Sequence, residues 1–325
     1  MSKAYYHRTM SPKIEALLQA ENGKYHWIID YVKKHRELDF QTGSNNVDSW
    51  FSIYRGTGRV LQISVSGKVS AHSKYEELCP EFYENPSPEL FDKLLEALRY
   101  CDNFKRYYAD DNNNSRKEGY YQTLISRRYT FNTREDDDFI IIDKELVIGF
   151  EDKNAEEEWN APISSNLGED ICSMRLQLEG TRLPAKIKDS YGEFDFLGLN
   201  WDGDIIIMEL KQDDPVKTYL SPVQVSYYQK QFSKLVNELP NLYNNILSMI
   251  EQKVRLGLIT IPEGKVLPSK LSGRILGYLI VGEDEPLSKE VCKKYKEIRR
   301  IILPEMEAYT CDEYGSLLRS KKLDD

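Results

Sequence analysis

Two short and almost wholly apolar runs follow one another in the chain, at 193–200 and 204–211. Both are bounded by polar or glycine residues, a pattern typical of buried β-strands. The first run carries Asp195, and the second ends in Glu209-Leu-Lys211. Charged side chains in a buried strand need an oppositely charged partner or a metal ion. The pattern therefore predicts a buried hairpin that carries a functional cluster.

The length of the turn decides whether these charges can meet. Side chains alternate between the two faces of a strand, so Glu209 and Lys211 share a face. A two-residue turn would point Asp195 away from Glu209, whereas a three-residue connection at 201–203, with Gly203 left-handed, sets them opposite each other. We predict the three-residue connection. The alternative is a surface hairpin with solvated charges, and the apolar flanks on both faces argue against it.

Hydrophobic periodicity elsewhere predicts two domains. The acidic stretch 151–158, which ends near Pro162, is interpreted as a linker between an α+β domain at 1–160 and an α/β domain at 161–325. In the first domain we expect helices from Ser11-Pro12 and over Lys24–Lys34, Ser87–Tyr100 and Arg116–Arg127, and strands at Ser49–Arg55, Arg59–Ser66, Tyr129–Thr133, Phe139–Asp143 and Glu145–Phe150. After the hairpin we expect a helix from Ser221, a strand Arg274–Val281, a helix Ser288–Arg300 and a strand near Met306–Thr310.

With Asp195 and Glu209-x-Lys211, the C-terminal half resembles the PD-(D/E)XK nuclease superfamily, the fold of restriction enzymes and RecB-type nucleases. Gln224-Val-Ser-Tyr-Tyr228 resembles the Gln-x-x-x-Tyr motif of RecB-like members. The resemblance covers roughly 161–325, and Phe194 stands where the family has proline, a position that varies in the superfamily. It implies a restriction-endonuclease-like mixed sheet flanked by helices, here preceded by the α+β domain.

The resemblance also implies a function, namely a Mg²⁺-dependent endonuclease or exonuclease that hydrolyses DNA, with Mn²⁺ as substitute, in restriction, phage defence or repair. Asp195 and Glu209 would bind the cation through oxygen, and the ion would activate a water molecule. Lys211 would orient or deprotonate that water or stabilise the transition state. Because a lysine beside two carboxylates keeps its charge readily, we favour the electrostatic role.

Superfamily members often add a carboxylate from the preceding helix. Glu169 is the candidate for this third metal ligand, and Glu179 is its rival at the far end of the same expected helix. The alternative for Glu169 is structural, because Asn166 followed three residues later by Glu169 is also a capping box.

Gln224 and Tyr228 are the other candidate site residues, and both have structural alternatives. Ser221-Pro222 is a typical helix start that would place Gln224 at the third helical position, where it would act as a cap. A cap does not explain Tyr228, which lies one turn further along the same face. Tyr228 could equally pack in the core.

Charge and cysteine usage limit the function classes. The formal net charge of −9 over 325 residues excludes the broad basic field of a nonspecific nucleic-acid coat, so a nuclease needs local cations. Five cysteines without C-x-x-C spacing, the lack of an apolar signal core and the lack of a run long enough to cross a bilayer lead us to expect a cytoplasmic protein without membrane contact. A basic cluster is interpreted as the solvated face of a helix rather than a phosphate track: Lys293, Lys294, Lys296, Arg299 and Arg300.

The role of residues 1–160 stays open. Their tyrosine and arginine residues are compatible with nucleic-acid recognition, partner binding or homodimer formation; these are Tyr54, Arg55, Arg59, Tyr107, Tyr108, Arg127 and Arg128. Two alternatives to a nuclease also remain. One is a catalytically inactive nuclease-fold module that binds nucleic acid, and the other is a protein-interaction scaffold. The complete set of Asp195, Glu209 and Lys211 favours the enzyme, because an inactive site has no physical reason to keep buried charges.

Overall fold

The computed structural model describes residues 4–44, 48–71, 73–101, 108–110, 115–178, 183, 193–212, 214–282 and 287–324. The chain forms two compact units. The first contains Met1–Tyr6, Asp136–Tyr243 and Gly264–Asp325, and the second contains His7–Glu135 and Asn244–Glu263. Each unit is therefore assembled from separate parts of the chain.

The boundary expected near residue 160 falls inside a helix instead. Helix α8 (Lys153–Gln177) runs through most of the acidic stretch that we interpreted as a linker. Asp152 starts this helix, and its side chain accepts a hydrogen bond from the backbone N–H of Ala155 (2.8 Å). Glutamate is a good helix former, and acidic side chains near a helix N-terminus interact favourably with the helix dipole. The same composition that suggested a linker is thus compatible with a first helical turn.

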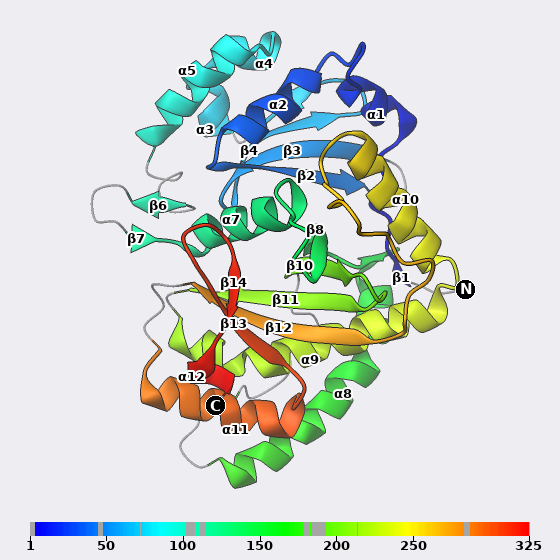
Figure 1. Ribbon diagram of the computed structural model, residues 1–325, viewed down its shortest axis with the longest axis vertical. Helices are drawn as coiled ribbons and strands as arrows, with labels where there is room; N and C mark the ends of the chain where they lie inside the picture. Colours follow the sequence, from blue (N-terminus) through cyan, green and yellow to red (C-terminus); the bar gives the residue numbers. More distant parts are fainter. Residues whose placement is uncertain are drawn as a thin grey trace. The chain divides into compact units, whose positions relative to one another are not determined.

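A six-stranded mixed sheet forms the centre of the first unit, with the strand order β14-β13-β12-β11-β10-β8 (Figure 1). Strand β10 is antiparallel to both of its neighbours, β8 and β11. Strands β11, β12 and β13 run parallel to one another, and β14 is antiparallel to β13. The predicted α/β class with a mixed sheet is confirmed. The strands are β8 (Phe139–Leu146), β10 (Phe194–Asn200), β11 (Ile205–Lys211), β12 (Ile275–Gly282), β13 (Glu307–Cys311) and β14 (Leu317–Arg319).

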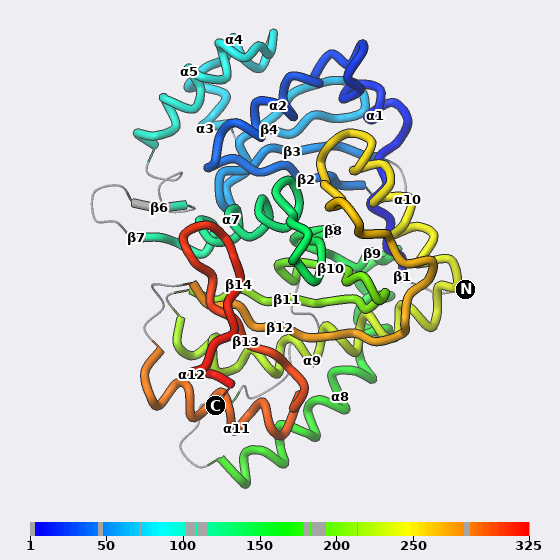
Figure 2. The backbone as a smooth tube through the Cα atoms, viewed as in Figure 1, coloured from blue at the N-terminus to red at the C-terminus, as the bar shows by residue number. Residues whose placement is uncertain are grey.

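Helix α9 (Pro215–Glu238) follows β11 in the chain and packs on both β11 and β12. Helices α8 and α11 (Lys289–Ile302) pack on α9, so the three helices lie on the same side of the sheet in Figure 1. The chain path from β10 through β11 into α9 can be followed in Figure 2. The short α12 (Lys321–Asp324) contacts α11, and β1 (Ala4–Tyr5) pairs with β9 (Gly149–Phe150) in a small separate sheet.

Gly277 shows which face of the sheet α9 covers. A Cβ atom at this position would lie 2.6 Å from Val225 Cγ1 of α9, so the close approach of helix and strand requires glycine. Gly277 is the register partner of Ile207, and Glu209 lies two residues further along the same strand. Because side chains two residues apart on a strand share a face, α9 covers the face that carries Glu209.

A four-stranded antiparallel sheet forms the second unit, with the order β2-β3-β4-β5. Its strands are β2 (Leu38–Ser44), β3 (Ser49–Arg55), β4 (Gly58–Ser64) and β5 (Val69–Ser70), and β6 (Ala109–Asp110) pairs separately with β7 (Ser115–Arg116). Its helices are α1 (Pro12–Leu18), α2 (His26–Lys34), α3 (Ser73–Glu76), α4 (Pro80–Glu84), α5 (Pro88–Arg99) and α7 (Glu118–Thr130). Helix α10 (Leu242–Arg255) begins in the first unit and continues into the second. The core of the second unit includes Ile28, Phe51, Phe82 and Phe91.

Several predicted elements are confirmed and others are wrong. Ser11 and Ser87 cap α1 and α5 as predicted, because their side chains accept hydrogen bonds from backbone N–H groups three residues on. The strand predicted at Tyr129–Thr133 is instead the end of α7 and the turn that follows. The two strands predicted between Phe139 and Phe150 are the single strand β8 and the two-residue β9.

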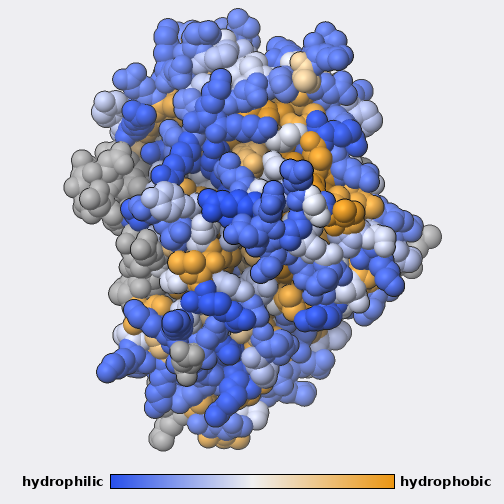
Figure 3. All heavy atoms as spheres, in the orientation of Figure 1, coloured by the Kyte–Doolittle hydropathy of each residue, from blue (hydrophilic) through white to orange (hydrophobic). Residues whose placement is uncertain are grey.

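Arg127 and Arg128, which we listed as residues that could contact nucleic acid, are buried within the second unit. Arg127 donates hydrogen bonds to backbone carbonyl groups of this unit. Tyr107 lies outside the described residues, and Arg59 is exposed on β4. Hydrophilic residues cover most of the face shown in Figure 3. Within the described part of the chain, none of the helices combines the length and the apolar character that crossing a membrane requires.

Candidate active site

The connection between β10 and β11 has the three residues that the sequence predicts. Leu199 pairs with Ile205, and the backbone N–H of Asn200 donates to the carbonyl of Asp204 (3.1 Å). Gly203 has a φ of +89°, in the left-handed region that favours glycine. The connection is therefore one residue longer than a tight turn, which sets the register of the whole hairpin.

This register places Asp195 opposite Glu209. Phe196 pairs with Met208, and one step further along the same register Asp195 faces Glu209 on the same face of the sheet. Asp195 is half-buried, and its Oδ2 accepts a hydrogen bond from the backbone N–H of Leu210 (2.7 Å). The Asp195 carboxylate thus reaches across to β11 beside Glu209.

Glu209 and Lys211 are both buried near the end of β11, with exposed fractions of 2% and 5%. The Lys211 ammonium donates a hydrogen bond to Glu209 Oε1. The two residues are two positions apart on one strand, so their side chains project from the same face. The structure therefore brings Asp195, Glu209 and Lys211 together on one face, at the start of β10 and the end of β11.

Gln224 and Tyr228 hold the backbone next to Asp195. Gln224 Nε2 donates to Tyr228 Oη (2.9 Å), and Tyr228 Oη donates to the carbonyl oxygen of Glu193 (2.9 Å). The fully buried Tyr228 ring also lies against the Phe194 ring, with 5.1 Å between the centroids. The two residues of the Gln-x-x-x-Tyr motif are thus hydrogen-bonded to each other and attached to the chain just before Asp195.

The cap that we considered for Gln224 is wrong, because α9 begins earlier. Its first residue is Pro215, and Asp214 caps it by accepting a hydrogen bond from the Lys217 N–H (3.0 Å). Pro222 lies inside the helix, where it has no N–H for the carbonyl of Thr218, and the hydroxyl of Ser221 donates to that carbonyl instead (2.8 Å). Gln224 is therefore far from the helix start, and its side chain bonds Tyr228.

The pKa of the Asp214 carboxyl group is lowered by its hydrogen bonds. Burial works to raise the pKa of its carboxyl group, but hydrogen bonds from the backbone N–H and ammonium of Lys217 outweigh burial. The pKa of Asp214 therefore lies below its usual value. This carboxylate stabilises the start of the helix that carries Gln224 and Tyr228.

Glu169 does not join the cluster. It is exposed on α8, and the capping box proposed at Asn166 is wrong because α8 already begins at Lys153. Among the described residues, no three His, Cys, Asp or Glu side chains are arranged to hold a metal ion together. Glu179 lies outside the described residues.

Glu145 is a neighbouring carboxylate that the sequence reasoning missed. The pairs Phe194–Leu146 and Phe196–Lys144 between β10 and β8 place Glu145 at the position across from Asp195. Glu145 also has a φ of +47°, which is uncommon for a residue other than glycine. Pairing between β8 and β10 joins segments some fifty residues apart, so no local pattern could have revealed this neighbour.

The cluster supplies two carboxylates and one ammonium. Mg²⁺ commonly uses one or two protein carboxylates and takes its other ligands from water and substrate phosphate. Asp195 and Glu209 therefore fit such an ion without a third protein carboxylate. Comparison of the chain with protein-family models, with curated proteins and with solved structures finds no match.

Proposed function

We propose that this chain is a metal-dependent nuclease that hydrolyses phosphodiester bonds in DNA. The observation that carries the proposal is the position of Asp195 opposite Glu209, with Lys211 on the same face. The path from an antiparallel hairpin through α9 and α10 into the parallel strand β12 supports a restriction-endonuclease-like fold of the PD-(D/E)XK type. Restriction, phage defence and repair are the processes in which such an activity would act.

Asp195 and Glu209 are the residues that would hold Mg²⁺ or Mn²⁺. When bound, such an ion lowers the pKa of a coordinated water and neutralises charge on phosphate oxygens. Glu209 is almost fully buried, so its carboxylate is shielded from solvent and interacts strongly with any cation nearby. Its present hydrogen bond to Lys211 shows that the position already accommodates one positive charge.

Lys211 contributes a positively charged side chain to the candidate site. Its ammonium has three donor hydrogens and stands two residues from Glu209 on the same face. In this position it can bind a non-bridging phosphate oxygen and stabilise the negative charge that develops in the transition state. We therefore assign Lys211 an electrostatic role.

Gln224 and Tyr228 act as positioning residues. The bond from Tyr228 Oη to the Glu193 carbonyl fixes the chain two residues before Asp195. Side chains that hold the ligands of a site in place raise its effectiveness without touching the substrate. This explains why the pair belongs to the site although neither residue is a cation ligand in our proposal.

Cleavage assays test the proposal directly. Plasmid, linear duplex and single-stranded DNA are incubated with the chain in Mg²⁺, in Mn²⁺ and in EDTA. We expect cleavage of at least one substrate in either metal, no cleavage in EDTA, and loss of cleavage in Lys211→Ala while circular dichroism shows a folded protein. Cleavage that persists in EDTA, or in folded Lys211→Ala, contradicts the proposal.

One observation favours a second function, that of an inactive module that binds nucleic acid. The Lys211 ammonium donates a hydrogen bond to an oxygen of Glu209, so the negative charge of this carboxylate is already compensated without a metal. This function predicts DNA binding that is independent of metal and unchanged in Lys211→Ala, with no cleavage of any substrate. A chain that neither cleaves nor binds DNA would point instead to a protein-interaction scaffold.

A further inference from the structure

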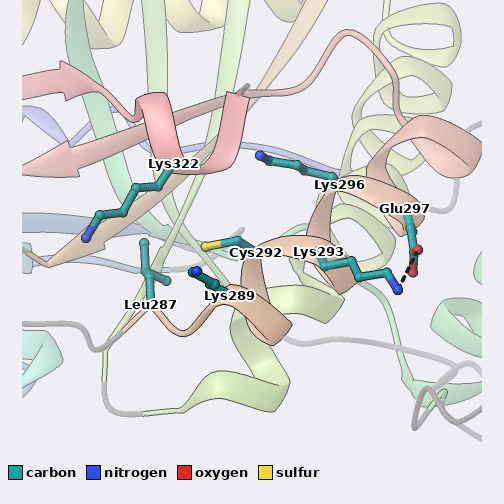
Figure 4. Close-up of a pocket in the computed structure, with 7 residues that line it drawn as sticks. All are labelled: Leu287, Lys289, Cys292, Lys293, Lys296, Glu297 and Lys322. Carbon is teal, nitrogen blue, oxygen red and sulfur yellow. Dashed lines mark ion pairs between the residues drawn. The ribbon is translucent and has the colours of Figure 1, made fainter.

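Helices α11 and α12 of the first unit line a pocket of about 700 Å³, shown in Figure 4. Ligand pockets for small molecules commonly have volumes of this order. Most of the lining belongs to α11, and the rest comes from α12 and from the residue before the α11 cap. The lining residues are Leu287, Lys289, Cys292, Lys293, Lys296, Glu297 and Lys322.

The lining is strongly positive although the whole chain is negative. Four lysines and one glutamate give the pocket a formal charge of +3, against −9 for the chain. Lys293 pairs with Glu297 at 3.9 Å. Within the described part of the chain, Lys289, Lys296 and Lys322 have no ion pair. Three ammonium groups without an ion pair among the described residues therefore line one open pocket.

The helix geometry explains why these charges converge. Lys289 and Lys296 are seven residues apart on α11, about two helical turns, so they share a face. Figure 4 shows Lys289, Cys292 and Lys296 pointing from α11 toward the side on which Leu287 and Lys322 lie, whereas Lys293 turns toward Glu297. The pocket thus combines a small apolar surface with three ammonium groups.

Lys289 stands at the end of α11 where the helix dipole does not favour a positive charge. Lys289 is the first residue of α11, directly after the cap Ser288. The N-terminus of a helix carries a partial positive charge, so a lysine there is repelled rather than stabilised. An anion bound in the pocket would interact favourably with these ammonium groups and with the N-terminus of α11.

We propose that this pocket binds a small ligand with several adjacent phosphate groups, such as a nucleoside triphosphate. Three ammonium groups match the charge of a polyphosphate chain better than that of a single phosphate. The apolar surface of Leu287 and Cys292 can contact the base or sugar. An open pocket of this volume lined by two helices suits a small molecule better than a rigid DNA duplex. In this proposal, Lys296 of the basic cluster that we interpreted as a solvated helix face takes part in binding.

Binding of tripolyphosphate and ATP to the full chain tests the proposal. Isothermal titration and thermal unfolding are measured in EDTA at fixed ionic strength, with inorganic phosphate as the monophosphate comparison. We expect tripolyphosphate and ATP to bind and to raise the melting temperature more than phosphate does. Tighter binding of ATP than of tripolyphosphate assigns the apolar surface to the nucleoside, and equal binding restricts the site to the phosphate chain.

Two variants and one control locate the binding. Lys296→Gln/Lys322→Gln should weaken tripolyphosphate binding by about tenfold or more, because two charge-assisted contacts are lost. Lys321→Gln changes an exposed lysine of the same α12 that does not line the pocket, and it should have little effect. Asp195→Asn should leave tripolyphosphate binding unchanged. Failure of the nuclease proposal can therefore be told apart from failure of the polyphosphate proposal.

Three results would overturn the proposal. The first is no saturable binding of either polyphosphate by the folded chain. The second is binding that the double variant leaves intact or that Lys321→Gln reduces equally. The third is a short DNA duplex that binds with the same lysine dependence and displaces tripolyphosphate, because it would make the pocket a contact for the nucleic-acid backbone.

Discussion

The Lys211 ammonium donates a hydrogen bond to the carboxylate of Glu209, two residues earlier on β11, and both side chains are buried. Opposite charges that are removed from water together are tolerated, because each compensates the other. Removing one of them leaves an unpaired charge in a surrounding of low polarity. The pair is therefore important for stability as well as for the proposed chemistry.

A double-mutant cycle on this pair should show strong coupling. We expect Lys211→Met or Glu209→Gln alone to lower the free energy of unfolding, by about 3 kcal/mol for the lysine change, which leaves a buried charge. The double variant should be more stable than the sum of the single effects predicts. Urea unfolding in EDTA measures all four proteins. Additive effects in the double variant would show that the two side chains do not depend on each other.

Asp195→Asn separates catalysis from folding. The amide oxygen can still accept the hydrogen bond from the Leu210 N–H, so the hairpin should keep its structure. Cleavage in Mg²⁺ should fall on the order of a thousandfold, because one of two anionic ligands is lost. Asp202→Asn, which changes an exposed residue of the connecting turn, is the matched control. Full activity in Asp195→Asn would exclude this residue as a cation ligand.

Tyr228→Phe tests whether the Gln-x-x-x-Tyr pair positions the site. The ring keeps its contact with Phe194 but loses the hydrogen bonds to Gln224 and to the Glu193 carbonyl. We expect a loss of about 1 kcal/mol in the free energy of unfolding. The kcat for DNA cleavage should fall roughly tenfold with KM little changed, because the chain before Asp195 is less well held.

Gln224→Ala is the comparison for this prediction, because it leaves the bond between Tyr228 and the Glu193 carbonyl in place. Its effect on kcat should be smaller than that of Tyr228→Phe. If both variants lose only stability and keep kcat, the pair is core packing and not part of the site.

The hairpin could be predicted because its determinants are local. Side chains alternate in direction along each strand, which sets the faces, and Gly203 permits the left-handed conformation of the connection. The start of α9 was missed for a local reason as well. Ser221-Pro222 resembles a helix start, and only the structure shows that the Ser221 hydroxyl replaces the missing N–H of Pro222.

Non-local contacts explain what the sequence could not reveal. The second unit includes part of α10 because Gln252 accepts from the N–H of Met10 (2.7 Å) and donates to its carbonyl (2.9 Å). These residues are far apart in the chain, and neither belongs to a recognisable motif. The position of Glu145 across from Asp195 depends on strand pairing of the same non-local kind.

Asp214 should make the stability of α9 depend on pH. Its pKa is lowered in the folded state, so its contribution is present above the unfolded value near 3.9 and is lost as pH falls through the folded value. Asp214→Ala should lower the free energy of unfolding by about 1 kcal/mol at neutral pH. Asp214→Asn keeps the cap and loses only the charge. The difference in the free energy of unfolding between wild type and Asp214→Asn should be constant above about pH 5 and should shrink below about pH 4. A difference that does not change with pH would contradict this assignment.

Arg127 should be a main stabilising residue of the second unit. Its guanidinium donates to the carbonyls of Val32 (2.6 Å) and Lys33 (2.8 Å) at the end of α2 and of Leu38 (2.8 Å) at the start of β2. Burial lowers its pKa, and the charge of Asp39 works against that shift. Arg127→Met leaves three carbonyls without this donor and should lower the free energy of unfolding by about 3 kcal/mol.

Arg127→Lys should recover only part of this loss, because one ammonium cannot reproduce the planar fork of the guanidinium. Hydrogen exchange of peptides from α2 and β2 measures the effect where these bonds are made. The matched control is Arg128→Met, since Arg128 donates to the carbonyl of Asn132 just after its own helix. Faster exchange in α2 and β2 for Arg127→Met than for Arg128→Met is the expected result. Equal exchange would mean that the packing of α7, rather than the guanidinium, holds the two elements together.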